Sequence, residues 1–263
     1  MKGDWNSDLA RSISSVGTTQ FHETLVKMLQ GLVEFDQSVI FAYYRDVPPI
    51  DLYDNFSKRK HHIHVTLYQE GPYLLDPFFQ ACSQDVKPSL YRLKELAPDR
   101  FYQSEYFRSY YARTGLAEEI GYFVDLPGSV TIVVSLMRSD KYSAYSAREF
   151  RKLKEVSEIV SALMQQQHAE LYHRFSGYVG DAGQSNIQRS IDHAFRNFGK
   201  NLLTPRERDV VEYVLKGNSS AAIGRLLNIT AGTVQIHRKN IYQKLGINSQ
   251  GELFSQFIKG LTL

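Results

Sequence analysis

The sequence has little cysteine and no long apolar run, and Cys82 is the only cysteine among its 263 residues. One cysteine cannot form an internal disulfide, nor can it build the multi-cysteine sites that hold zinc or iron–sulfur clusters. Such a chain is typical of a reducing cytosol. No window approaches the ~18 consecutive apolar residues of a membrane span, and the first residues lack the apolar core of a signal peptide. We therefore expect a cytoplasmic protein with no membrane partner.

Motifs of the common enzyme chemistries are also missing. The sequence contains no Gly-x-Ser-x-Gly elbow, no glycine-rich phosphate loop and no metal-binding helix motif. His61, His62 and His64 lie close together, but no acid or cysteine stands beside them in sequence, which disfavours a metal site. Cys82 would need a basic neighbour to serve as nucleophile or redox sensor, so a small buried residue is the preferred interpretation. The sequence predicts no enzyme, no catalytic residue, no cofactor and no metal.

Excess positive charge is confined to the end of the chain. The whole sequence has a formal net charge of +3, while residues 200–263 hold nine Lys and Arg against four Asp and Glu, a net charge of +5. The remainder is therefore at −2. A basic end on a near-neutral body favours a polyanion partner there, and a solvated basic surface is the alternative.

Residues 1–175 alternate between helical and strand patterns. The predicted helices are 21–33, 74–83, 101–113 and 146–174, and the predicted strands are 38–44, 62–68, 90–93, 119–126 and 130–137. Pro127-Gly128 predicts a type II turn between the last two strands, because proline presets φ and glycine accepts positive φ. The sum is an α+β fold, with an antiparallel sheet and helices in an α-β-α, sensor-like domain.

Glycines then mark a boundary. Gly177, Gly180 and Gly183 fall in a stretch with little apolar character, which predicts a linker over 176–199. A short connecting helix is expected at 187–198. The chain is thereby divided into a domain at 1–175, the linker, and a second domain at 200–263.

Helix-boundary signals become dense after Leu203. Thr204 can cap a helix, Pro205 suits its first position, and Glu207 completes a Thr-x-x-Glu capping box. Further caps and stops follow at Gly217, Ser219 or Ser220, Asn228, Thr230, Gly246 and Ser249. They predict an all-α, four-helix domain in which two short helices, a tight turn and a polar third helix form a helix-turn-helix.

This segment resembles the LuxR/NarL-type DNA-binding domain. The matching string is Leu-Thr-Pro-Arg-Glu-Arg at 203–208, Gly217, Ile223, Leu227, Ile229, Thr233-Val234, His237, Lys244-Leu245-Gly246 and Glu252-Leu253. The spacing holds without a gap across about 50 residues, which is far more specific than a helix-turn-helix pattern alone.

The resemblance implies a homodimer on double-stranded promoter DNA, with RNA polymerase as a further partner. It implies that Gln235, Ile236 and Lys239 read bases, and that the phosphate-side residues are Thr230, Thr233, Arg238 and Lys244. Gln235 stands where the family commonly has lysine. Glutamine suits adenine whereas lysine favours guanine, so we expect a different operator base at that position. Dimerisation is assigned to the apolar face of the fourth helix, at Leu253, Phe254 and Phe257.

Three kinds of input domain commonly precede this DNA-binding domain. A phosphoacceptor receiver needs an acidic pair after its first strand, but the opening offers only Asp4 and Asp8 with no strand beside them. An acyl-homoserine-lactone receptor uses pocket tryptophans, and the only tryptophan is Trp5, near the terminus. A GAF/PAS-like sensor fits the element order best. The segments Leu-Asp-Pro-Phe and Tyr-Tyr-Ala-Arg-Thr-Gly-Leu also resemble those of orphan LuxR-type regulators.

Aromatic residues are dense between positions 68 and 123. They predict a pocket whose rings could hold a cationic amine, with Asp76 or Glu105 orienting the ligand. The predicted ligand-binding residues are Tyr68, Asp76, Phe78, Tyr91, Tyr106, Tyr110 and Tyr122. An aromatic core with a dimer surface is the alternative for any one of these residues.

The sequence thus predicts a ligand-responsive transcription regulator whose effector, a small molecule, is unidentified. One alternative is control by a protein partner through the N-terminal domain. A lactone receptor and an enzyme fused to a DNA-binding domain are further alternatives that the sequence disfavours.

Overall fold

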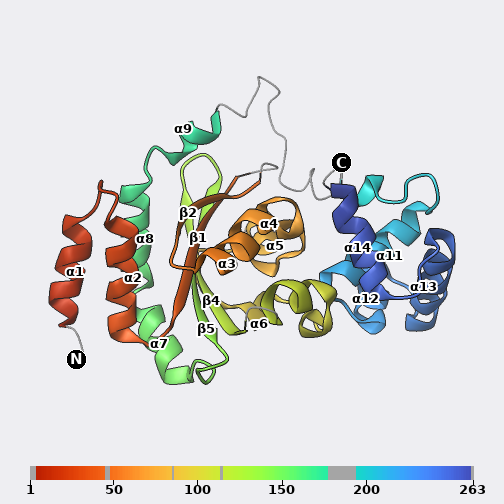
Figure 1. Ribbon diagram of the computed structural model, residues 1–263, viewed down its shortest axis with the longest axis horizontal. Helices are drawn as coiled ribbons and strands as arrows, with labels where there is room; N and C mark the ends of the chain where they lie inside the picture. The colour runs from red at the N-terminus through yellow and green to blue at the C-terminus, as the bar shows by residue number, and fades with distance from the viewer. Residues whose placement is uncertain (1–3, 45–47, 85, 113–114, 177–193, 262–263) are drawn as a thin grey trace.

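The computed structural model describes residues 4–44, 48–84, 86–112, 115–176 and 194–261. An α+β N-terminal domain lies beside an all-α C-terminal domain (Figure 1), which confirms the predicted fold class. Most of the predicted linker, 177–193, falls outside the described residues, and 194–197 is helical. None of the helices in the described ranges combines the length and apolar character that a bilayer span requires.

Within the described residues, five strands form one antiparallel sheet in the order β2-β1-β5-β4-β3. The strands are β1 (Gln37–Tyr44), β2 (Ile50–Asp54), β3 (Ser89–Arg92), β4 (Leu116–Leu126) and β5 (Val130–Ser139). β4 and β5 form the predicted hairpin, in which Leu126 pairs with Val130. Gly128 has the expected positive φ of 78°, but Ser129 is also left-handed at 62°. The two strands are thus joined by a three-residue loop, in which Gly128 has the positive φ that the predicted type II turn requires at its second central position.

Regular helices cover one face of this sheet (Figure 1). They are α2 (Phe21–Leu32), α7 (Ala147–Glu155), α8 (Ser157–Gln167) and α9 (Leu171–Ser176), while α1 (Trp5–Ser14) packs on the outer side of α2. The single helix predicted over 146–174 is wrong, because the chain breaks at Val156 and again after Gln167. One straight helix of that length would run for ~43 Å. The 11 residues of β4 span only ~36 Å, so the breaks keep the segment on the sheet.

Short, irregular helices cover the other face. They are α3 (Lys58–His61), η1 (His62–Thr66), α4 (Leu67–Gln69), η2 (Pro72–Leu75), α5 (Pro77–Ser83), α6 (Leu93–Leu96), η3 (Phe101–Gln103) and η4 (Phe107–Tyr111). Of these, η1 and η4 are π-helical turns, and η2 and η3 are 3₁₀ turns. The helix predicted at 101–113 is thus replaced by η3 and η4, and position 113 lies outside the described residues.

The strand predicted at 62–68 is also wrong. Its buried residues are His64, Val65 and Tyr68, a spacing that fits one side of a helix and not the alternation of a strand. The second strand of the sheet is β2, directly after Pro49. The sequence prediction missed this strand.

The sheet separates two apolar cores by strict alternation along its strands. In β1, Val39, Phe41 and Tyr43 belong to the core under the irregular helices. Their neighbours Ile40 and Ala42 belong to the core under α2, α7 and α8.

Four helices form the described part of the C-terminal domain, as predicted. They are α11 (Pro205–Lys216), α12 (Ser220–Leu227), α13 (Ala231–Leu245) and α14 (Gln250–Leu261). The irregular helices of the N-terminal domain face this bundle (Figure 1), and buried residues of both belong to one continuous apolar cluster. The core under the irregular helices therefore extends into the C-terminal domain.

Candidate functional site

The predicted caps of the C-terminal helices are confirmed. Thr204 and Glu207 form the capping box of α11: the Thr204 amide donates to Glu207 Oε2 at 2.8 Å, and the Glu207 amide donates to Thr204 Oγ1 at 3.3 Å. Gly217 ends that helix in the left-handed region. Ser219 and Thr230 cap α12 and α13. Local hydrogen bonds thus set the start of three successive helices.

The turn between α12 and α13 depends on two residues with little steric demand. Asn228 adopts φ 55°, the left-handed conformation that asparagine tolerates. A Cβ on Gly224 would lie 2.7 Å from the carbonyl oxygen of Ile229, so glycine allows α12 to pack tightly on the turn. These contacts fix the angle at which α13 leaves the bundle.

Helix α13 presents the three predicted base-reading residues to solvent. Gln235, Ile236 and Lys239 are exposed, and Ile236 is 62% exposed although it is apolar. Thr230 and Thr233 lie at the start of the helix, where their hydroxyl oxygens are 2.9 Å apart. A protruding helix with polar ends and an exposed apolar side chain fits the major groove, where such groups meet base edges and thymine methyl groups.

Lys244 has a partner inside its own domain. Its Nζ donates to the two carboxylate oxygens of Glu207 at 2.9 and 2.7 Å. Burial opposes ionisation of Glu207, but the Lys244 bridge and the Thr204 hydrogen bonds together lower the pKa of this carboxyl. The arrangement ties the end of α13 to the start of α11, so a phosphate role for Lys244 stays a prediction beside this structural role.

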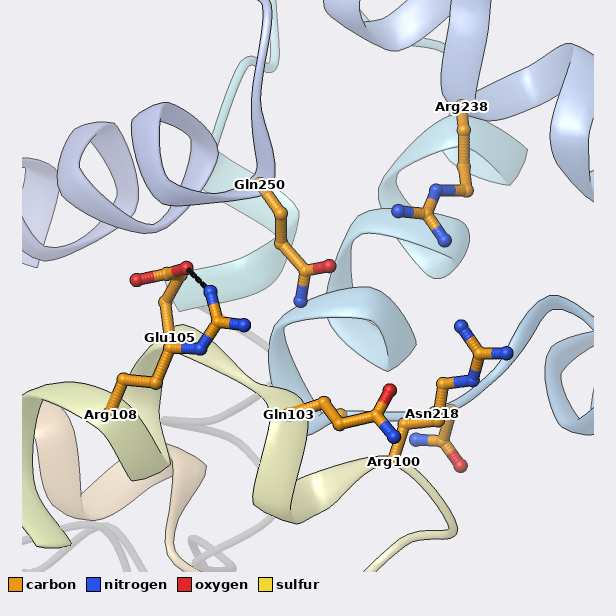
Figure 2. A pocket seen from close by; sticks show the side chains of 8 residues that line it. Arg100, Gln103, Glu105, Arg108, Asn218, Arg238 and Gln250 are labelled. Carbon is orange, nitrogen blue, oxygen red and sulfur yellow. Dashed lines mark hydrogen bonds and ion pairs between the residues drawn. The ribbon is translucent and has the colours of Figure 1, made fainter. Parts of the chain in front are cut away.

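Arg238 turns toward the N-terminal domain. Figure 2 shows it across a hollow from Arg100 and Gln103. The hollow has a volume of about 200 Å³, and Asn218 and Gln250 also line it. On the same rim Arg108 pairs with Glu105 at 2.9 Å. The sequence also offered Glu105 as a ligand-orienting acid, and the structure places it at this junction rather than among the lining of the buried cavity described below.

Backbone contacts join the two domains beside this hollow. The Arg100 amide donates to the carbonyl oxygen of Gly217 at 2.9 Å, and the Ser219 amide donates to Asp99 Oδ1 at 2.9 Å. A Cβ on Gly217 would lie 2.8 Å from Phe101 Cα. Gly217 is therefore required both for its left-handed backbone and for this close approach.

The assignment of Leu253, Phe254 and Phe257 to dimerisation is wrong. All three side chains are buried within the chain, because the apolar face of α14 packs into the core of its own domain. Phe257 stacks on Phe195 with ring centroids 4.7 Å apart. The same residues cannot also face a second copy.

The second candidate site is a small cavity between the sheet and the irregular helices. Its volume is about 30 Å³. It is lined by Val39, Phe41, Tyr43, His64, Tyr68, Asp76, Phe78, Tyr106, Tyr110, Tyr111, Glu119, Ser135 and Met137. Both π-helical turns contribute to this lining, since η1 carries His64 and η4 carries Tyr110 and Tyr111. Such turns are frequent at functional sites.

Five of the seven predicted ligand-binding residues line this cavity, and two do not. Tyr122 lies on the opposite face of the sheet, where its hydroxyl donates to the carbonyl oxygen of Leu153 at 2.8 Å. Tyr91 donates to the carbonyl oxygen of Lys87 and packs its ring against Phe123. The alternation of β4 places Tyr122 away from the cavity.

Asp76 is the end of a buried hydrogen-bond chain. The Tyr43 and Tyr68 hydroxyl oxygens are 2.9 Å apart, and the Tyr68 hydroxyl donates to Asp76 Oδ2 at 2.7 Å. The Phe78 amide donates to Asp76 Oδ1 at 2.8 Å, which caps α5. Burial raises the pKa of Asp76 to about 6, although these hydrogen bonds lower it.

Glu119 is the acid that the sequence prediction missed. Its side chain comes from β4 and is only 3% exposed, and its Oε2 atom has no hydrogen-bond partner. Burial and the charge of Asp76 raise the pKa of Glu119 to about 8, while hydrogen bonds from Ser135 and Tyr111 lower it. The available signal was an acid directly before the apolar run 120–124 of the predicted strand. Its spacing of three residues from Tyr122 places the two side chains on opposite faces of the sheet.

The histidines and the cysteine form no metal site in the described residues, where no group of three metal-ligating side chains comes together. His61 Nδ1 lies 2.7 Å from Asp54 Oδ2. His64 is separate from that pair, stacked on Phe56, and its Nε2 atom is buried without a partner. Burial raises the pKa of Cys82 well above its ordinary value, so the thiol stays protonated and unreactive.

These elements define a protein with a DNA-binding helix-turn-helix attached to a domain that contains a small cavity lined by aromatic rings and two acids. Residues 201–256 match the family model of the bacterial regulatory proteins of the luxR family. A putative HTH-type transcriptional regulator in the exeN 3′ region of Aeromonas salmonicida is 32% identical over 186 residues, which cover 71% of this chain and 94% of that protein. The chain therefore belongs to the LuxR family of transcriptional regulators.

Two further comparisons locate the similarity. The transcriptional regulatory protein MctR of Rhizobium johnstonii is 34% identical over 134 residues, or 49% of this chain and 58% of MctR. The crystal structure of the VqsR LBD domain from Pseudomonas aeruginosa covers 64% of this chain and 99% of that chain, with a TM-score of 0.56 and 24% identity. The latter similarity shows that about two thirds of this chain has the fold of that domain.

Proposed function

We propose that this LuxR-family regulator senses a small molecule in its N-terminal cavity and alters its binding to promoter DNA. The observation that carries the proposal is the cavity itself, in which Glu119 and His64 each leave a buried polar atom without a partner. Buried polar atoms are normally satisfied. A ligand would supply the missing partners.

The DNA-binding half of the proposal follows from the exposed side of α13. One such helix contacts only a few base pairs, and helix-turn-helix proteins commonly bind as dimers to two half-sites one helical turn apart. We therefore propose a homodimer on a pseudo-palindromic promoter site. The proposal implies a cytoplasmic protein that acts together with RNA polymerase, since transcription of the chromosome takes place there.

The contacts between the domains suggest how occupancy would reach the DNA-binding helix. Segment 99–101 contacts Gly217 and Ser219, and it leads within a few residues to η4, which lines the cavity. A route through segment 146–174 is less direct, because α7 and α8 lie across the sheet from the C-terminal domain (Figure 1). A ligand acts through such contacts only by binding one arrangement more tightly than another.

The first test measures ligand and DNA together. Purified full-length protein is screened by thermal unfolding against metabolites, because a ligand that binds the folded state raises the midpoint. Each hit is titrated into a fluorescence-anisotropy assay with a promoter fragment selected from random DNA. We expect a saturable midpoint rise and a change of about fivefold or more in DNA affinity.

The Asp99→Ala variant tests the route between the domains. It removes the Ser219 hydrogen bond without touching the cavity, so ligand should still raise the midpoint while the change in DNA affinity shrinks. Hits that alter neither DNA affinity nor promoter output would contradict the proposed ligand response. A protein partner would then become the better account of the N-terminal domain.

The DNA-reading role is tested separately with Gln235→Ala. We expect a change in base preference at one position of each half-site, worth about 1–3 kcal/mol of discrimination. Gln243→Ala is the matched control, because Gln243 is exposed on the same helix outside the predicted reading positions. An unchanged binding motif in the Gln235 variant would remove this residue from the reading role.

A further inference from the structure

The cavity contains two buried carboxyl groups and no basic side chain other than a histidine. Asp76 and Glu119 line it together, and the thirteen lining residues include no lysine or arginine. The ion pairs found among the described residues include neither acid. Burying acids without a cation is unfavourable unless protons or an external cation neutralise them.

Each structural layer around Glu119 contributes only neutral or acidic groups. From the sheet come Ser135 and Tyr43, and from the irregular helices come Tyr111, His64 and Asp76. Burial, aided by the charge of Lys60, lowers the pKa of His64 to about 4, so this ring is neutral at pH 7. No cation within the described lining therefore balances the two acids.

Aromatic rings complete the surroundings. Phe41, Tyr106 and Tyr111 line the same space, and the faces of such rings attract organic cations. A neutral ligand would use the rings and hydroxyls but leave the two acids without a counter-charge. A metal ion would find only two carboxyl groups and one histidine, and no described group of three is arranged to hold one.

We propose that the ligand of this cavity is a small organic cation, a protonated amine or amidine, whose charged head lies between Glu119 and Asp76. The inference rests on the proposed ligand-sensing function and specifies its chemistry. The free Oε2 atom of Glu119 is an acceptor available to the head group, and so is the free Nε2 atom of His64 when the ring proton is on Nδ1. Asp76 is already engaged by Tyr68 and by the Phe78 amide, and it contributes mainly its charge.

The size of the cavity limits what binds without rearrangement. Its volume of about 30 Å³ is close to the share of one molecule in liquid water, which suits an ammonium-sized head. Tyr110 is the one lining residue of the cavity that is not fully buried. A longer molecule would extend past this ring.

Binding of a cation should release a proton. Because the pKa of Glu119 is raised to about 8 and that of Asp76 to about 6, the empty pair holds about one proton at pH 7. A cation between the acids stabilises both charged forms and lowers their pKa values. Titration calorimetry in two buffers of different ionisation enthalpy would detect this release.

The test compares amines with uncharged molecules of the same shape. Full-length protein at pH 7 is titrated with n-butylamine, benzylamine and benzamidine, and in parallel with butan-1-ol, benzyl alcohol and benzamide. Potassium chloride at equal ionic strength controls for salt. We expect a saturable rise in the thermal midpoint with at least one cation, and little or none with its neutral counterpart or with potassium.

Two variants assign the effect to the acids. Glu119→Gln keeps the shape and removes the charge, and it should weaken cation binding about tenfold or more, as expected for loss of a charged hydrogen-bond partner. Asp76→Asn keeps an acceptor for the α5 cap and should weaken it as well. Tyr91→Phe, outside the cavity, should bind as the wild type does.

Opposite results overturn the inference. Equal shifts with amines and alcohols, no shift with any of the cations, or full cation affinity in Glu119→Gln would each show that charge does not select the ligand. The proposed function fails separately, when no small molecule of any charge alters DNA binding. A neutral metabolite that raises the thermal midpoint and shifts DNA affinity would support the sensor function and contradict a cationic ligand.

Discussion

The two faces of the β-sheet treat buried charge in opposite ways. On the face covered by regular helices, Arg138 is buried with Glu149 2.6 Å away, and its guanidinium stacks on Tyr145. On the cavity face, Asp76 and Glu119 are buried without such a partner among the described residues. One face neutralises its charges internally, and the other leaves two acids that only protons or a ligand can neutralise.

The two faces also differ in how regular their helices are and in whether their buried charges are paired. On the helix-covered side, a second buried pair, Arg92 and Glu118, is also closed at 2.6 Å. The cavity side is built from short helices and two π-helical turns. Departures from regular local structure and from full polar satisfaction are expected where a protein functions. The comparison therefore points to the cavity side as the functional one and to the other side as its support.

The largest effect should come from opening an ion pair on the supporting face. Arg138→Met removes the partner of Glu149 and the donors to the carbonyl oxygens of Glu34 and Ser143. Breaking a buried pair costs about 3–5 kcal/mol. We expect the free energy of unfolding, measured with urea at pH 7, to fall by about 3 kcal/mol. This is the lower end of that range, because Glu149 is partly exposed.

Acidic pH should reduce the difference in stability between the wild type and Arg138→Met. Hydrogen bonding to Arg138 lowers the pKa of Glu149 to about 2. A lowered pKa gives stability that is present above the ordinary glutamate range and is lost as pH falls toward 2. The gap between wild type and variant should therefore narrow in acid. Arg151→Met, at an exposed position of α7, is the control, and a loss below about 0.5 kcal/mol in both variants would contradict the contrast between the faces.

Sequence reasoning located the C-terminal domain well because its signals are local. The capping box of Thr204 and Glu207, the left-handed Asn228 and the stop at Gly246 each act within a few residues. The hairpin of β4 and β5 was predicted for the same reason, from the turn at Gly128.

Elements shaped by tertiary packing were predicted less well. Segment 62–68 has β-branched residues, yet it folds as helical turns because His64, Val65 and Tyr68 must face the cavity side together. β2 was missed because its place in the sheet depends on pairing with β1. The apolar face of α14 was mistaken for a dimer surface because apolar periodicity does not reveal what covers it.

The cavity was predicted in part. Dense aromatics indicated a pocket, and five of its lining residues follow from that signal. Glu119 was passed over because a strand acid is usually solvated, and its burial depends on the irregular helices opposite. Tyr122 was included because density alone does not distinguish the two faces of a strand.

An effect of intermediate size and opposite sign is expected on the cavity face. Glu119→Gln should stabilise the protein at neutral and alkaline pH, because the wild-type carboxyl must stay protonated or ionise while buried. The pKa is raised from 4.5 to about 8, so the group favours folding below pH 4.5 and this contribution is lost as pH rises through 8. We expect no difference at pH 4 and a gain of about 2 kcal/mol at pH 6, which grows further toward pH 8.

Urea unfolding of the wild type and of Glu119→Gln between pH 4 and pH 8.5 measures how the difference in their stability changes with pH. Glu155→Gln, an exposed glutamate on α7, controls for removal of one negative charge. A constant difference across the pH range would show that Glu119 does not titrate as a buried acid. That result would mean that buried charge is no less well balanced on the cavity face than on the helix-covered face, and the contrast between the two faces would be wrong.

The smallest effect on stability is expected when one buried tyrosine on each face is replaced by phenylalanine. Tyr122→Phe removes a hydroxyl that donates to the Leu153 carbonyl on the supporting face, and Tyr68→Phe removes one that donates to Asp76 on the cavity face. Each should cost about 1 kcal/mol, the usual value of one buried hydrogen bond. The stability of the two variants should nonetheless depend differently on pH, because only the Tyr68 hydrogen bond stabilises an ionised group.

Without that donor the pKa of Asp76 should rise further, since the Tyr68 hydrogen bond opposes the effect of burial. A raised pKa removes stability as pH increases, so the cost of Tyr68→Phe should grow from pH 4 to pH 8 while that of Tyr122→Phe stays level. Only Tyr68→Phe should also change the response to an added ligand. Parallel pH profiles for the two variants would mean that the hydrogen bonds of the two faces are equivalent, and that the cavity owes its character to the unpaired Glu119 alone.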